Sequence, residues 1–137
     1  MRAAISFAAF ATLLAISPAS VAQTPAGAAW SSAETVEIQL SNYKFAPSNF
    51  TLRQGQAYRL HLVNAASGGH SFSAPEFFAA AQVDPADAAA ISKGKVEVEG
   101  GQTRDIRVIP QKPGTYEFQC THFLHAPMGM KGRITVE

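Results

Sequence analysis

The chain has 137 residues, of which 47% are hydrophobic, and its formal net charge at pH 7 is +1. This near balance of charge gives no support for binding to nucleic acid or to an acidic membrane surface. The single cysteine excludes an internal disulfide bond.

Residues 1–22 have the pattern of a cleaved secretory signal peptide. Met1-Arg2 is followed by an apolar run as far as Ile16, and Ser20-Val21-Ala22 offers a small-residue cleavage site. The run is shorter than the ~20 residues that a membrane-spanning helix needs. We therefore expect export to the periplasm, or secretion where the cell has no outer membrane.

Removal of the signal peptide would leave 115 of the 137 residues, with ten basic and ten acidic side chains once Arg2 is lost. This length suits one domain with a single hydrophobic core. We expect residues 23–33, which are small and turn-rich, to be a flexible lead-in, and residues 34–137 to form the domain.

Alternation of apolar and polar residues predicts about seven to eight short strands. They lie at residues 35–40, 43–45, 50–53, 57–63, 95–99, 103–109, 115–120 and 132–136. Residues 64–69 are expected to loop without regular structure. Residues 75–92 are rich in alanine and contain Pro75 and Pro85, which favours one or two short helices there. The even spacing of the strands indicates an all-β sandwich.

Three soft metal ligands follow the strand that ends near residue 120. Cys120 is the only cysteine of the chain, His125 lies five positions later and Met130 five positions after that. A site of two histidines and a cysteine, with a weak axial methionine, holds a blue-copper ion. Coordination would also explain an unpaired cysteine in an exported protein, which is otherwise open to oxidation.

The second histidine has three candidates. His70 follows a strand in a glycine-rich loop, where functional residues concentrate, and is the best placed. His61 lies in the middle of a strand and is expected on a sheet face. His122 lies two residues from Cys120, so it either lines the site or serves as an alternate ligand.

Met128 competes with Met130 as the axial ligand. Met130 directly precedes the closing strand and is better anchored, whereas Met128 lies beside Pro127 and is expected near the surface. A structural zinc site would need more cysteine or histidine ligands. A catalytic metal site would need an open position and a general base, and no acidic residue lies in this loop.

These motifs resemble the cupredoxins, the type 1 blue-copper proteins that include plastocyanin, pseudoazurin and azurin. The likeness is carried by three stretches, Phe45–Gly55, Pro113–Cys120 and His125–Val136, and by the position of His70. The resemblance implies a Greek-key β-sandwich and one copper ion per chain that cycles between Cu(I) and Cu(II). Its implied ligands are His70, Cys120, His125 and Met130.

Two positions depart from the usual family pattern. Four residues separate Cys120 from His125, as in azurin-like loops, whereas the spacing from His125 to Met130 resembles plastocyanin. Ser71 stands where many members carry an asparagine that ties the two ligand loops together.

We expect a one-electron carrier between periplasmic redox partners rather than an enzyme, because protein side chains fill all four metal positions. Partners are expected to dock transiently on apolar residues around His125, namely Phe123, Leu124, Ala126, Pro127 and Met128. Two alternatives remain. One is copper sequestration or delivery, with His61, His122 and Met128 as surplus donors. The other is a copper subunit of a larger oxidoreductase.

Overall fold

The computed structural model describes residues 26–137, which form eleven strands, two short α-helices and one 3-10 helix. In chain order these are α1 (Ala26–Ser31), β1 (Glu34–Ser41), β2 (Lys44–Ala46), β3 (Asn49–Leu52), β4 (Tyr58–Asn64), β5 (His70–Ser73), α2 (Pro75–Ala79), β6 (Ala81–Val83), η1 (Ala88–Ala90), β7 (Ile91–Ser92), β8 (Lys95–Val98), β9 (Thr103–Pro110), β10 (Gly114–Gln119) and β11 (Lys131–Val136).

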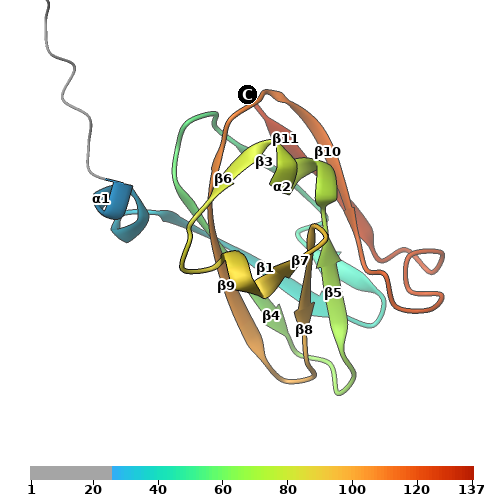
Figure 1. Cartoon of the computed structure of the whole chain (residues 1–137). Helices are drawn as coiled ribbons and strands as arrows, with labels where there is room; N and C mark the ends of the chain where they lie inside the picture. Colours follow the sequence, from blue (N-terminus) through green and yellow to red (C-terminus); the bar gives the residue numbers. More distant parts are fainter. Residues whose placement is uncertain (1–25) are drawn as a thin grey trace, which may run out of the picture.

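The strands form two sheets that pack as a β-sandwich (Figure 1). One sheet has the order β2-β1-β4-β9-β6 and the other β3-β11-β10-β5-β8-β7. In the longer strands, alternate residues point into the space between the sheets; in β4, Tyr58, Leu60 and Leu62 are buried while Arg59 is exposed. The predicted all-β sandwich is therefore confirmed.

All eight predicted strands are present, as β1 to β4 and β8 to β11. Three further strands, β5, β6 and β7, are two to four residues long and were not predicted. The helical segment at residues 75–92 is confirmed by α2, which begins at Pro75 and buries Phe77 and Phe78, and by η1.

The predicted signal peptide at residues 1–22 lies outside the described residues. The expected lead-in at 23–33 differs from the structure where it can be compared, because residues 26–31 form α1 and the side chain of Trp30 is buried. No helix within residues 26–137 has the length and apolar character needed to cross a bilayer.

Three adjacent strands, β5, β10 and β11, deliver the candidate ligands to one end of the sandwich. β10 pairs with β11 from Gly114↔Val136 to Gln119↔Lys131, and with β5 at Gln119↔Ser73. The loop between β10 and β11 projects from this end (Figure 1). Phe72 and Phe118 pack with their ring centroids 4.8 Å apart and form a buried aromatic floor beneath it.

Candidate metal centre

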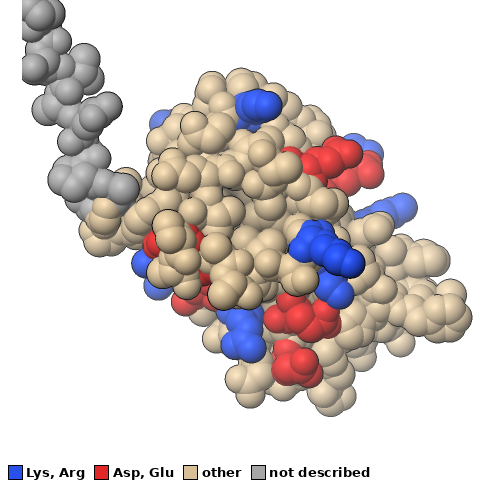
Figure 2. Space-filling view, viewed as in Figure 1, with Lys and Arg blue, Asp and Glu red and all other residues tan. Residues whose placement is uncertain are grey.

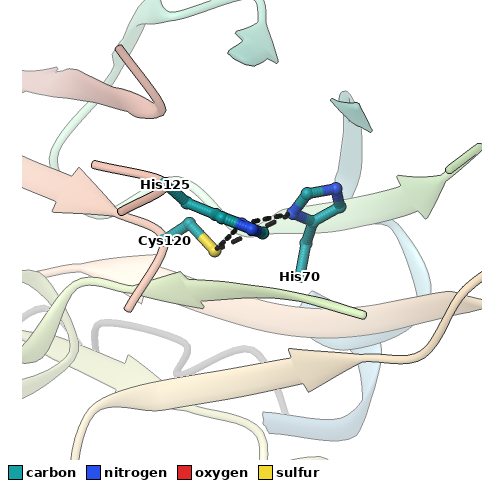
Figure 3. Close-up of side chains that lie close together, drawn as sticks. All are labelled: His70, Cys120 and His125. Carbon is teal, nitrogen blue, oxygen red and sulfur yellow. Dashed lines mark hydrogen bonds between the residues drawn. The ribbon is translucent and has the colours of Figure 1, made fainter. Parts of the chain in front are cut away.

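His70, Cys120 and His125 converge on a single point (Figure 3). His70 is the first residue of β5, Cys120 follows the last residue of β10, and His125 lies in the projecting loop. The two Nδ1 atoms are 3.1 Å apart. The Sγ atom of Cys120 is 3.8 Å from Nδ1 of His70 and 3.4 Å from Nδ1 of His125.

The spacing of these three atoms fits one metal ion. Zinc, a first-row ion like copper, lies about 2.0–2.1 Å from histidine nitrogen and about 2.3 Å from cysteine sulfur. Two nitrogens that share such an ion are therefore at most about 4.2 Å apart, and a nitrogen and a sulfur at most about 4.4 Å apart. All three observed separations fall below their limits. One imidazole nitrogen from each of two histidines and one thiolate is also the donor set of a trigonal copper site.

The candidate ligands differ in their access to solvent. His70 and Cys120 are buried, whereas His125 is only partly buried. Burial, followed by repulsion from positive charge on His125 and His122, lowers the pKa of His70 below its usual value. The imidazole of His70 is therefore held neutral, with a nitrogen lone pair available to a metal.

Asn42, in the turn between β1 and β2, fixes the orientation of His70. Nε2 of His70 lies 3.0 Å from Oδ1 of Asn42, which can only accept a hydrogen bond. Nε2 therefore carries the proton, and Nδ1, which faces the cluster, does not. No feature of the sequence indicated this role, because Asn42 lies 28 residues before His70.

Ser71 ties the two ligand segments together. Its backbone N–H donates to Sγ of Cys120 at 3.4 Å, and its hydroxyl lies 3.8 Å from the same sulfur. The hydroxyl oxygen also accepts the backbone N–H of Thr121 at 2.8 Å. A serine in this position therefore links β5 to the segment after Cys120.

Met130 is fully buried and belongs to the hydrophobic core, whereas Met128 is 59% exposed. The backbone of Met130 is anchored beside two candidate ligands: its carbonyl accepts the N–H of Cys120 at 3.1 Å, and its own N–H donates to the carbonyl of His125 at 3.0 Å. These bonds close the loop on itself and hold Met130 beside the cluster.

The rival histidines lie outside the cluster. His61 is on the outer face of β4, where its Nδ1 is 2.6 Å from Oδ1 of Asp105. The Nε2 atom of His122 contacts the carboxylate of Glu97 on β8. Sequence reasoning placed His61 correctly on a sheet face but gave no sign of the Glu97 contact, which arises only when β8 pairs with β5.

The model of the cupredoxin-like domain family matches residues 5–136, and the chain belongs to this family. No curated protein matches the sequence.

Solved structures share the fold at low sequence identity. A dithionite-reduced auracyanin from the photosynthetic bacterium Roseiflexus castenholzii is 24% identical, with a TM-score of 0.56 over 77% of this chain and 98% of its own. Auracyanin A, a "blue" copper protein from Chloroflexus aurantiacus, is 20% identical, with a TM-score of 0.55 over 75% and 98%. A multi-copper oxidase from Pseudomonas thermotolerans is 18% identical, with a TM-score of 0.60 over 78% of this chain and 30% of that chain.

Proposed function

We propose that this protein binds one copper ion through His70, Cys120, His125 and Met130 and carries single electrons between redox partners in the periplasm. The observation that carries the proposal is the convergence of two imidazole nitrogens and one cysteine sulfur within 3.1–3.8 Å. Family membership supports it, since the auracyanin A that shares the fold is described as a blue copper protein.

Copper, when bound, would supply the one-electron couple Cu(II)/Cu(I). The chain would hold the four donors in place and keep water away. Burial of His70, Cys120 and Met130 excludes solvent on the inner side, and the aromatic floor of Phe72 and Phe118 packs beneath. A rigid site that changes little between oxidation states suits an electron carrier.

His125 is the route to the surface in this proposal, because it is the partly buried member of the cluster. Large apolar side chains around it are exposed: Tyr43 38%, Phe123 88%, Leu124 53% and Met128 59%. We call these four residues the apolar tip. Figure 2 shows that the projecting end of the molecule carries no charged side chains in this view.

The backbone of Leu124 adds support for a role in contact. Its φ of +63° lies in the left-handed region, which costs a non-glycine residue roughly 1–2 kcal/mol. Folding alone would favour glycine at this position. A large, half-exposed leucine in a strained conformation is typical of a binding surface.

A redox protein is the partner that fits the apolar tip. Electron-transfer complexes are small and short-lived, and a small set of exposed apolar side chains supports such contacts. Sequestration has less support, because His61 and His122 are each engaged by a carboxylate and lie outside the donor cluster. The likeness to part of a multi-copper oxidase keeps a subunit role as an outcome for partner identification.

Copper binding is tested by titrating the purified domain, residues 23–137, with Cu(II). We expect an intense thiolate-to-copper absorption band that saturates at one equivalent and is absent in Cys120→Ser. His61→Gln is the matched control, because His61 lies outside the cluster, and it should keep the band. A colourless protein that prefers zinc would overturn the proposal.

The docking surface is tested by electron self-exchange between the Cu(I) and Cu(II) forms, which requires no known partner. Met128→Lys should slow exchange in a salt-dependent manner, since two lysines would meet when the tips of two molecules touch. Gln82→Lys, on the exposed side of β6, adds the same charge elsewhere and should have a smaller effect. Equal rates in both variants would contradict docking at the apolar tip.

A further inference from the structure

We propose that Glu97 and His122 act together as positioning residues for His125, with Glu97 holding the ring of His122 stacked against the imidazole of His125. This inference rests on the proposed function, because it concerns the ligand that links the metal to the surface. It gives a role to His122, whose place between two candidate ligands the sequence left open.

The ring of His122 has neighbours on three sides, although the side chain is 35% exposed. Its Nε2 contacts the carboxylate of Glu97. Its plane stacks on the ring of His125, with centroids 5.4 Å apart and an interplanar angle of 23°. A Cβ atom built on Gly69 would lie 3.4 Å from its Cε1 atom, so this edge of the ring faces Gly69. His122 is thus linked to β8 by its side chain although it lies in a loop.

The ring of His125 lies between the candidate ligands on one side and side chains of the loops on the other. Its Nδ1 faces Cys120 and His70. Its ring packs edge-on with that of Tyr43, with centroids 5.0 Å apart and an interplanar angle of 67°. Tyr43 is itself 38% exposed and lies in the turn between β1 and β2. The ring of His125 also lies 4.9 Å from that of His70 on β5, and the stacked ring of His122 adds a second connection to the sheet, through Glu97 on β8.

Glu97 links this contact to the backbone of the sheet. It lies within β8 and pairs with Ser71 of β5, the residue that donates to Sγ of Cys120. A second contact, with Nζ of Lys95 at 3.4 Å, helps to hold the carboxylate. The same pair of strands thus orients Cys120 through Ser71 and His125 through Glu97 and His122.

The consequence concerns how the metal leaves the site. His125 is the partly buried member of the cluster, so rotation of its side chain is the movement that would open the site to solvent. A stacked ring anchored to a sheet opposes this rotation. Loss of either Glu97 or His122 should therefore raise the rate of metal release clearly and lower the free energy of unfolding only slightly.

The experiment measures the transfer of copper from the Cu(I)-loaded domain to an excess of a Cu(I) chelator. Glu97→Ala and His122→Ala should each release copper about tenfold faster, at the lower end of the effect of residues that orient metal ligands. Glu97→Gln should stay close to the wild-type rate, because its amide oxygen still accepts a hydrogen bond from Nε2. The double variant should be no faster than either single alanine variant, because both remove one contact.

Glu99→Gln is the matched control for charge. It removes a carboxylate near Gly69 that has no hydrogen bond to His122, so release should be unchanged. Wild-type rates in Glu97→Ala and His122→Ala would overturn the inference. Equal acceleration in Glu99→Gln would also overturn it, because the effect would then come from local charge.

A second measurement keeps the test independent of copper. Three-bond NMR couplings in the metal-free domain report the χ1 rotamer of His125. We expect one dominant rotamer in the wild type and averaging in His122→Ala. Wild-type protein that binds no copper but shows this difference would refute the proposed function and leave the positioning intact. If the protein binds copper but wild type and His122→Ala have identical couplings and release rates, the proposed function would stand and the positioning role would be refuted.

Discussion

Oδ1 of Asn42 accepts a hydrogen bond from Nε2 of His70 at 3.0 Å and thereby determines that Nδ1 of that ring faces Cys120 and His125. Asn42→Ala would leave Nε2 without this acceptor, so the ring could adopt the other tautomer or turn away. We expect copper affinity to fall by about tenfold, as for other residues that orient a histidine ligand.

Competition with a chelator of known affinity measures this change. Asn42→Asp keeps an acceptor oxygen at the same position and should retain the affinity. An unchanged affinity in Asn42→Ala would mean that burial alone orients His70.

Ser71→Ala should lower the reduction potential of the copper-loaded protein. Its hydroxyl lies 3.8 Å from Sγ of Cys120, and a donor to the sulfur draws electron density away from the metal, which favours the reduced form. The expected shift is on the order of tens of millivolts, where 59 mV corresponds to a tenfold change in a one-electron equilibrium. Protein-film voltammetry measures it.

Thr121→Val is the control for Ser71→Ala. It removes the hydroxyl that lies 3.0 Å from the Ser71 hydroxyl but leaves Ser71 beside the sulfur. The potential should therefore move less than in Ser71→Ala. A larger shift in Thr121→Val would place the effect in the link between the segments rather than in the contact with sulfur.

Met130→Leu should raise the reduction potential, whereas Met128→Leu should leave it unchanged. Both substitutions are close in volume, so packing changes little. Only Met130 is buried; its thioether would serve as the weak fourth donor to copper, and loss of that donor would disfavour Cu(II). The potential and the EPR spectrum of the Cu(II) form decide between the two methionines.

Asp87→Asn should destabilise the fold at neutral pH but not in acid. Hydrogen bonds from the Arg107 guanidinium and from the Arg107 backbone N–H lower the pKa of Asp87, despite the opposing effect of its burial. This stabilisation is present above the unfolded-state pKa of about 3.9 and is lost as the pH falls through the lower folded-state value. Asp87→Asn should lower the melting temperature by a few degrees at pH 7.

Thermal unfolding between pH 7 and pH 3 checks this expectation. The difference between wild type and Asp87→Asn should narrow as the pH falls. Glu117→Gln, an exposed carboxylate on β10 with no ion pair among the described contacts, is the control. A difference that is constant across this range would show that the carboxylate charge is not the source.

The strands that alternate in sequence were predictable because one face of each is buried. β5 was not predicted, because His70, Ser71 and Phe72 are buried in succession and the strand shows no alternation of apolar and polar residues. Ser71 is covered by Cys120, which lies 49 residues further along the chain. β6 and β7 exist only through pairing with β9 and β8, which local sequence does not encode.

The convergence of His70, Cys120 and His125 was predictable for a related reason. Cys120, His125 and Met130 lie in one loop, so their spacing is visible in the sequence, and His70 was the histidine best placed to join them. The residues that orient them were not predictable. Asn42 reaches His70 from another turn, and Glu97 reaches His122 only through the register of β8 on β5.

Under the proposed function, His70 and Met130 are buried, so electrons would enter and leave the site through His125 and the apolar tip. A donor and an acceptor that both use it must take turns, because the two would occupy the same few side chains. Turnover would then follow a ping-pong pattern, with no three-protein complex at any stage. An excess of oxidised or reduced partner would slow electron transfer, because that partner would occupy the apolar tip and block the other.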